Sequence, residues 1–241
     1  MARISALSIT LTLNVIATCA WVLTASAADA PRSDSDPVET KLLAQPTSGV
    51  ATILSDAVYQ ISQIAGQNGD RVFLVVDKVH GTIALFENGE VKFAAAALTG
   101  QSTADAMPPD AIAKTHAQHV GVKYKVTPAG RYTVSPVFDP QYGMVLEINE
   151  NQGPDWSLAI HEVALWNKSQ RRDARLRSAN DEDKHITDGC VDVDAATIRQ
   201  LLRLLTKKGR VPIYILPMDE TLTPGLFFAP ATANNRRARS G

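Results

Sequence analysis

The residue in this sequence best suited to do chemistry is Cys190. The chain has two cysteines, and the other one, Cys19, lies in an N-terminal segment that we expect to be removed. A thiol without a disulfide partner in an exported protein needs another role. Gly189 precedes the cysteine, so the backbone can take conformations closed to other residues and leave room for a substrate carbonyl. We therefore predict that Cys190 is a nucleophile exposed on a sharp turn.

The residues around Cys190 have opposing effects on the reactivity expected of its thiol. Residues from Val191 onward are expected to begin a helix, whose unpaired N–H groups and dipole stabilise a thiolate. The N–H groups of Gly189 and Cys190 are also placed to hold an oxyanion. Nearby negative charge raises the pKa of a thiol, unless the carboxylates point away or cap the helix. The acidic residues concerned are Asp188, Asp192 and Asp194.

A nucleophilic cysteine also needs a general base, and the chain offers five histidines. His161 ends a predicted strand, from which its side chain can point into a cleft. His185 precedes the cysteine closely and is the alternative base, whereas His80 lies in a turn and is expected to be structural. His116 and His119 form an His-x-x-His pair without a nearby third ligand, so we predict no metal and no cofactor.

The elements that must position these residues follow from hydrophobic periodicity. Helices are expected over 47–67 and 195–205, the second ending before Gly209. Alternating or continuous apolar runs predict strands, with an Asn-Gly hairpin turn joining the second and third of them. These strands are expected at 72–76, 82–86, 91–98, 130–134, 144–148, 157–160 and 211–216. The highly charged segment 164–184 is expected to be solvated loop and helix.

The termini predict an exported protein with one folded domain. Residues 1–27 combine Arg3, an apolar run and small residues at its end, which is typical of a cleaved signal peptide. We expect a flexible linker at 28–46, a folded domain at 68–219 and a loose tail at 220–241. The mature protein is then periplasmic, with no stable membrane span.

The composition excludes some function classes. The chain has 24 basic and 25 acidic residues, and removal of Arg3 leaves 23 against 25, a net charge near −2. This balance lacks the excess of Lys and Arg that is typical of proteins that bind nucleic acid. At 45% hydrophobic residues the sequence is typical of a globular protein.

Three segments together resemble the catalytic domain of the L,D-transpeptidases (YkuD-like). Residues 126–132 resemble that family's Thr-Pro-x-Gly-x-aromatic element, and His161 ends the expected strand. Thr187-Asp188-Gly189-Cys190-Val191 matches its Ser/Thr-x-Gly-Cys-hydrophobic nucleophile motif. The resemblance covers about 71–216 and implies a mainly β fold, a β-sandwich of mixed sheets capped by an α-helix, with an N-terminal helix added.

The resemblance also implies roles for individual residues. Cys190 matches the nucleophile that attacks the peptide bond after the third residue of a peptidoglycan stem peptide and forms a thioester. His161 matches the general base, its tautomer held by a nearby backbone carbonyl. Gly189 and Cys190 match the oxyanion-binding backbone, and Thr187 matches the hydroxyl that steadies the loop. An amine acceptor from another stem peptide or from a protein would then take the acyl group.

The nucleophile motif departs from the family form at two positions. Asp188 stands where the family most commonly has His, and Asp192 stands where it usually has Asn or Arg. These acidic residues keep two alternatives open. One is a hydrolase of the same fold, in which water resolves the thioester and stem peptides are trimmed or detached. The other is a peptidoglycan-binding module without turnover.

Overall fold

The computed structural model describes residues 54–111, 120–149, 158–222 and 224–228. The predicted signal peptide and linker, the start of the predicted N-terminal helix, His116, His119 and the end of the C-terminal tail lie outside these ranges. Within them, none of the helices has the length and hydropathy needed to cross a membrane.

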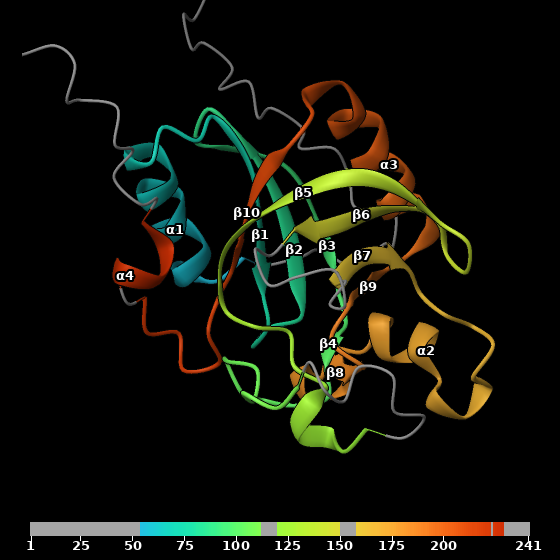
Figure 1. Cartoon of the computed structure of the whole chain (residues 1–241). Coiled ribbons are helices and arrows are strands. Elements are labelled where there is room, and N and C mark those ends of the chain that lie inside the picture. The colour runs from blue at the N-terminus through green and yellow to red at the C-terminus, as the bar shows by residue number, and fades with distance from the viewer. Residues whose placement is uncertain (1–53, 112–119, 150–157, 223, 229–241) are drawn as a thin grey trace, which may run out of the picture. The chain divides into compact units, whose positions relative to one another are not determined.

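The described part of the chain is mainly β, as predicted (Figure 1). The strands are β1 (Val72–Asp77), β2 (Thr82–Glu87), β3 (Glu90–Ala96), β4 (Thr99–Gly100), β5 (Gly130–Asp139), β6 (Gly143–Asn149), β7 (Leu158–Glu162), β8 (His185–Thr187), β9 (Val191–Val193) and β10 (Val211–Ile215). The helices are α1 (Asp56–Gln67), α2 (Arg172–Arg177), α3 (Ala195–Leu205) and α4 (Pro224–Phe227). Short 3-10 turns occur at Val122–Tyr124, Lys168–Gln170, Asp181–Lys184 and Thr206–Lys208.

Eight strands form one mixed sheet in the order β3-β2-β1-β10-β5-β6-β7-β9. The β1–β10 and β7–β9 pairs are parallel, and the other neighbours are antiparallel. The β2–β3 hairpin turns at Asn88-Gly89, where both residues have positive φ, as the Asn-Gly pair predicts.

The two ends of this sheet meet. Leu98, just after β3, pairs with Asp192 in β9 through two backbone hydrogen bonds of 2.8 and 2.9 Å. Because β3 and β9 are the outermost strands, this pairing requires the sheet to fold back on itself. In Figure 1, β5, β6 and β7 cross in front of β1, β2 and β3. β4 and β8 form a separate parallel pair beside this junction.

The folded-back sheet encloses the main core. One face of its strands shares a single cluster of buried apolar side chains with α3, including Leu74, Leu146, Ile213 and Leu201. The opposite face of β1, β2 and β10 packs under α1. β1 is therefore buried on both faces, which explains why its sequence is a continuous apolar run rather than an alternating one.

Two features mark the ends of the described domain. Within the described residues, α1 begins at Asp56, because Ser55 is extended and its hydroxyl donates to Asp77 Oδ2 at 2.6 Å. The tail predicted at 220–241 is not loose at α4, where Phe227 is fully buried against Tyr214. The side-chain amide of Asn68 also donates to the Phe227 carbonyl at 2.8 Å.

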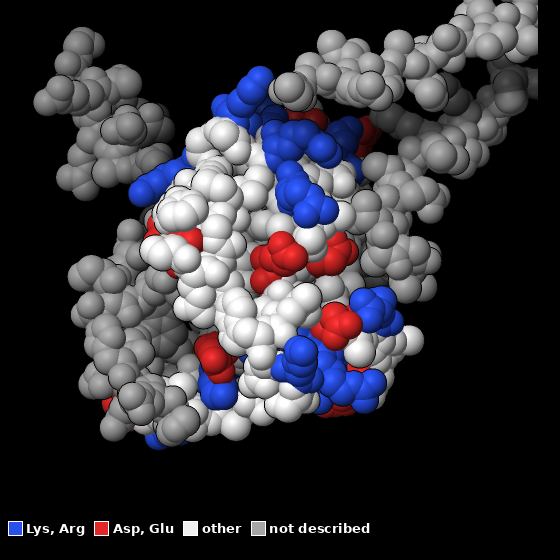
Figure 2. All heavy atoms as spheres, turned by 90° about the vertical axis from the view of Figure 1, so that its right-hand side faces the viewer, with Lys and Arg blue, Asp and Glu red and all other residues white. Residues whose placement is uncertain are grey.

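On the face that carries α2 and α3, charges of both signs are mixed. Lys and Arg side chains gather in two groups with Asp and Glu between them (Figure 2). This face has no broad patch of one sign, in keeping with the near-neutral composition.

Candidate active site

Cys190 lies between two short strands, not at the start of a helix. β8 ends at Thr187 and β9 begins at Val191, so the predicted helix start after the cysteine is wrong. The helix α3 starts only at Ala195, and the side chain of Asp194 accepts its cap hydrogen bond from Thr197 N at 2.7 Å. The two β-branched residues of β9, Val191 and Val193, are both buried in the main core, which favours a strand. The thiol therefore has no helix dipole to lower its pKa.

The turn that presents Cys190 is fixed by hydroxyl groups. Thr187 Oγ1 donates to the Cys190 carbonyl at 2.6 Å and accepts from the Gly189 N–H at 3.1 Å. Thr127 Oγ1 donates to the Gly189 carbonyl at 2.7 Å and accepts from Gly100 N at 2.8 Å. Gly189 has φ +129°, and a Cβ there would lie 2.7 Å from the Val126 carbonyl oxygen. Only glycine fits this position without strain.

His161 lies on β7 directly beside β9, with Asp192 as its register partner. The ring is buried, and its Nδ1 lies 2.8 Å from the Glu162 carbonyl oxygen. A carbonyl only accepts, so Nδ1 carries a proton and Nε2 of the neutral ring has the free lone pair. The Tyr142 ring stacks on the imidazole with centroids 3.9 Å apart. The ring orientation is therefore held from two sides.

Asp192 connects the histidine to an arginine from α2. Its Oδ2 accepts from Arg172 Nη1 at 2.8 Å, and its Oδ1 lies 3.5 Å from His161 Nε2. Oδ1 has no hydrogen-bond partner among the described residues. Burial raises the pKa of Asp192, while the nearby His161 and Arg172 act in the opposite direction.

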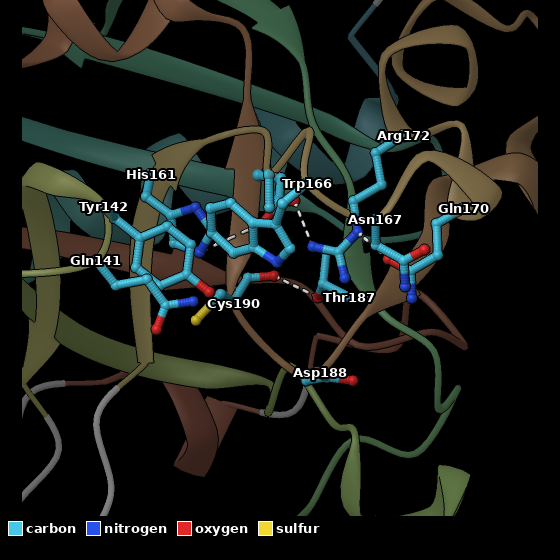
Figure 3. A pocket seen from close by; sticks show the side chains of 12 residues that line it. Gln141, Tyr142, His161, Trp166, Asn167, Gln170, Arg172, Thr187, Asp188 and Cys190 are labelled. Atoms are coloured by element: carbon cyan, nitrogen blue, oxygen red, sulfur yellow. Dashed lines mark hydrogen bonds and ion pairs between the residues drawn. The ribbon is translucent and has the colours of Figure 1, made fainter.

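These groups line one open pocket of about 200 Å³ (Figure 3). Tyr142 and Trp166 bring aromatic rings to it, with centroids 5.2 Å apart. The lining residues are Gln141, Tyr142, His161, Ala164, Trp166, Asn167, Gln170, Arg172, Thr187, Asp188, Cys190 and Asp192. Polar and aromatic side chains thus surround a single thiol.

The thiol is protonated at neutral pH in this arrangement. Burial raises the pKa of Cys190 to about 12, and the charges of Asp192 and Asp188 act in the same direction. The Ala159 backbone N–H and the Arg172 charge lower it, but by less. Within the described part of the chain, no hydrogen bond joins the thiol to His161. The pocket therefore holds a neutral thiol near an imidazole and not a preformed ion pair.

Comparison of the sequence with models of protein families identifies the family of this domain. The model of the L,D-transpeptidase catalytic domain family, YkuD, matches residues 71–213, more than half of the chain. The chain belongs to the L,D-transpeptidase catalytic domain family. This confirms the resemblance carried by the Thr187–Val191 motif and by the 126–132 segment.

Solved structures of L,D-transpeptidases are similar to the chain at low identity. The enzyme from Xylanimonas cellulosilytica is 15% identical, with 64% of this chain and 68% of that chain covered and a TM-score of 0.37. L,D-transpeptidase 1 from Mycobacterium tuberculosis is 12% identical, with 61% and 62% covered and a TM-score of 0.35. The helical cell shape determining protein Pgp2 from Campylobacter jejuni is 16% identical, with 68% and 57% covered and a TM-score of 0.39.

The chain spans about half to two thirds of the length of the first such structures. A search of curated proteins finds no match.

Among the residues predicted for the L,D-transpeptidase site, Cys190, Gly189, Thr187 and His161 come together. The alternative base does not line the pocket. His185 pairs with Thr99 through β8 and β4, its Nδ1 is 3.2 Å from Thr99 Oγ1, and burial lowers its pKa.

The two departures from the family motif have different surroundings. Asp188 is exposed and its Oδ1 lies 2.9 Å from Lys125 Nζ, whereas Asp192 is fully buried beneath the pocket. The charge of Asp188 is thus paired at the surface, and that of Asp192 acts inside the site.

Among the pocket residues that were not predicted from the sequence, three bring an aromatic ring or a charge to the site. Tyr142 lies in the β5–β6 turn, and Trp166 and Arg172 lie in the charged segment expected to be solvated. Arg172 is instead buried, with 9% of its side chain exposed. No local feature of the sequence distinguishes Arg172 from the exposed arginines of the same charged segment.

Proposed function

We propose that this protein is a peptidoglycan L,D-transpeptidase that uses Cys190 as nucleophile and His161 as general base. The observation that carries this proposal is the single pocket in which the thiol, the imidazole and the hydroxyl-braced turn meet. Membership of a family that acts on peptidoglycan supports a stem peptide as the donor.

The acylation step uses the neutral thiol. Cys190 Sγ attacks the carbonyl carbon of the third residue of the stem, and its proton passes to His161 Nε2 as the carbon–sulfur bond forms. Glu162 supports this step because its carbonyl fixes the proton on Nδ1 and leaves Nε2 basic. The Asp192 carboxylate, 3.5 Å from Nε2, would stabilise the imidazolium. Cleavage of the carbon–nitrogen bond then releases the terminal D-amino acid, whose amine takes the proton from His161.

We assign to the Cys190 N–H the hydrogen bond that stabilises the oxyanion formed in this step. The Gly189 N–H, which the family resemblance also implies, already donates to Thr187 Oγ1 at 3.1 Å. A donor that remains bound to a hydroxyl contributes less to a developing negative charge. The braced turn would thus hold the Cys190 N–H in place and not supply a second donor.

The second half of the reaction transfers the acyl group to an amine. The amine nitrogen attacks the thioester carbon, the carbon–sulfur bond breaks, and the proton of the amine returns to the sulfur through His161. The acceptor is an amine of another stem or of a protein. The predicted signal peptide supports a periplasmic location for this reaction.

The test is incubation of the purified protein with a defined stem tetrapeptide, followed by product identification by mass. A transpeptidase gives release of the terminal amino acid and a new dimer, whereas a hydrolase gives tripeptide without dimers. A carbapenem should add its mass to the wild-type chain and not to Cys190→Ala. An adduct that persists in Cys190→Ala excludes this thiol as the nucleophile.

A stem-peptide binding module is the second candidate. The raised pKa of the thiol, about 12, and the absence of a bond between the thiol and His161 within the described structure favour it. In that case stem peptides bind, yet neither a carbapenem adduct nor any product forms.

A further inference from the structure

Arg172 reaches the pocket from α2 and is held there by two contacts. Its Nη1 donates to Asp192 Oδ2 at 2.8 Å, and its Nε donates to Gln170 Oε1 at 2.7 Å. Figure 3 shows the guanidinium between Trp166 and Gln170, with one nitrogen that no dashed contact reaches. The buried side chain is thus fixed in orientation by an acid below it and an amide beside it.

The third nitrogen, Nη2, has no partner among the described residues. It is also not one of the fully buried polar atoms that lack a partner, so it is open to the pocket that Arg172 lines. Among the described residues no protein acceptor is bound to this nitrogen, so its N–H groups remain available to a molecule that enters the pocket. An acceptor that enters the pocket would meet two free N–H donors on a cation.

The charge balance of the pocket admits an anion. The two acidic residues that face it are both paired with cations, Asp192 with Arg172 and Asp188 with Lys125 at 2.9 Å. An incoming carboxylate therefore meets no unpaired negative side chain here. The planar guanidinium also matches the geometry of a carboxylate better than a single ammonium would.

We propose that Arg172 anchors a carboxylate of the stem peptide beside Cys190, with Asp192 as its positioning residue. This inference rests on the proposed function, which supplies the stem peptide as ligand. A stem tetrapeptide offers two such groups, the terminal carboxylate and a side-chain carboxylate on a diamino acid at the third position. Either would make a charge-assisted hydrogen bond to Nη2.

The test compares three peptides with the full-length chain. The parent carries both carboxylates, the first analogue has a terminal carboxamide, and the second has lysine at the third position. We expect wild type to lose about 10-fold or more in kcat/KM with one analogue, since a hydrogen bond to a charged group contributes about 1.5–3 kcal/mol. The analogue with the reduced kcat/KM identifies the carboxylate that Arg172 binds.

In Arg172→Gln the penalty for that analogue should fall below about 3-fold, because the charged donor that made the difference is gone. Arg177→Gln removes an equal charge from the exposed end of α2 and should keep the wild-type penalty. The ratio is measured within one preparation, so it does not depend on the folded fraction. If Arg172→Gln does not fold, Arg172→Lys replaces it, with an intermediate penalty expected.

Two results overturn the inference while the proposed function stands. One is a wild-type protein that turns over all three peptides equally, and the other is a penalty that Arg172→Gln retains. If wild type turns over none of them, the proposed function fails. The Kd values of the three peptides for Cys190→Ala, with and without Arg172→Gln, then decide the carboxylate contact separately by calorimetry.

Discussion

His161 Nε2 and Asp192 Oδ1 lie 3.5 Å apart, and the acid is fully buried. The two residues are register partners on the parallel strands β7 and β9, so the sheet itself holds them side by side. Asp192 also binds Arg172, and the three side chains form a buried polar row that borders the pocket of the thiol. This row is the feature that most distinguishes the site from the family motif, which usually has Asn or Arg at the Asp192 position.

Asp192→Ala should destabilise the protein by about 3 kcal/mol, because it leaves a buried guanidinium without its partner. Asp188→Ala removes an exposed carboxylate with 67% of its side chain accessible, and should change the stability by less than about 1 kcal/mol. Urea unfolding followed by circular dichroism measures both changes. Equal effects of the two substitutions would contradict the burial-based ranking.

Alkylation of Cys190 by iodoacetamide should be slow at pH 7 and keep rising at pH values above 9, toward the folded-state pKa of about 12. The same thiol in urea should reach its plateau near pH 9, the ordinary value. Because the folded-state pKa is raised, this group favours the folded state fully below pH 9 and loses that contribution as the pH rises toward 12. A plateau at pH 7 to 8 in the folded protein would show a thiolate already formed.

Gly189→Ala should cost several kcal/mol and abolish acylation, because both its φ of +129° and the Val126 carbonyl 2.7 Å away oppose a Cβ. Gly69→Ala separates these causes, since Gly69 has φ +78° but nothing within 4 Å of the new Cβ. We expect Gly69→Ala to cost about 1–2 kcal/mol from backbone strain alone. Thermal unfolding and the rate of carbapenem acylation are the measurements.

Thr187→Val should slow acylation about 10-fold or more while it leaves the fold in place. Valine keeps the shape but loses the donor to the Cys190 carbonyl and the acceptor for the Gly189 N–H. Thr206→Val removes the exposed hydroxyl that donates to Leu202 O, and serves as the matched control. Unchanged acylation in Thr187→Val would mean that the hydroxyl does not hold the turn.

The sequence anticipated the parts of the fold that local patterns encode. The buried run of β1, the Asn88-Gly89 hairpin and the apolar stripe of α3 each follow from the burial of a strand, turn or helix in its own neighbourhood. The prediction of a helix from Val191 is wrong because a three-residue strand is too short to show the alternating pattern that identifies a strand. Tertiary contacts with Leu98 and Ile160 decide its conformation instead.

The sequence by itself determined the family, the mainly β core and the Thr187–Cys190 motif, since all three depend on residue types at fixed spacing. Only the tertiary structure decided that Arg172, from a segment expected to be solvent-exposed, is buried against Asp192, which also lies beside His161. The physical reason is that a charged side chain is buried only where folding brings it a partner. Here that partner is Asp192, whose strand pairs with β7 and with Leu98 through long-range contacts that no local pattern records.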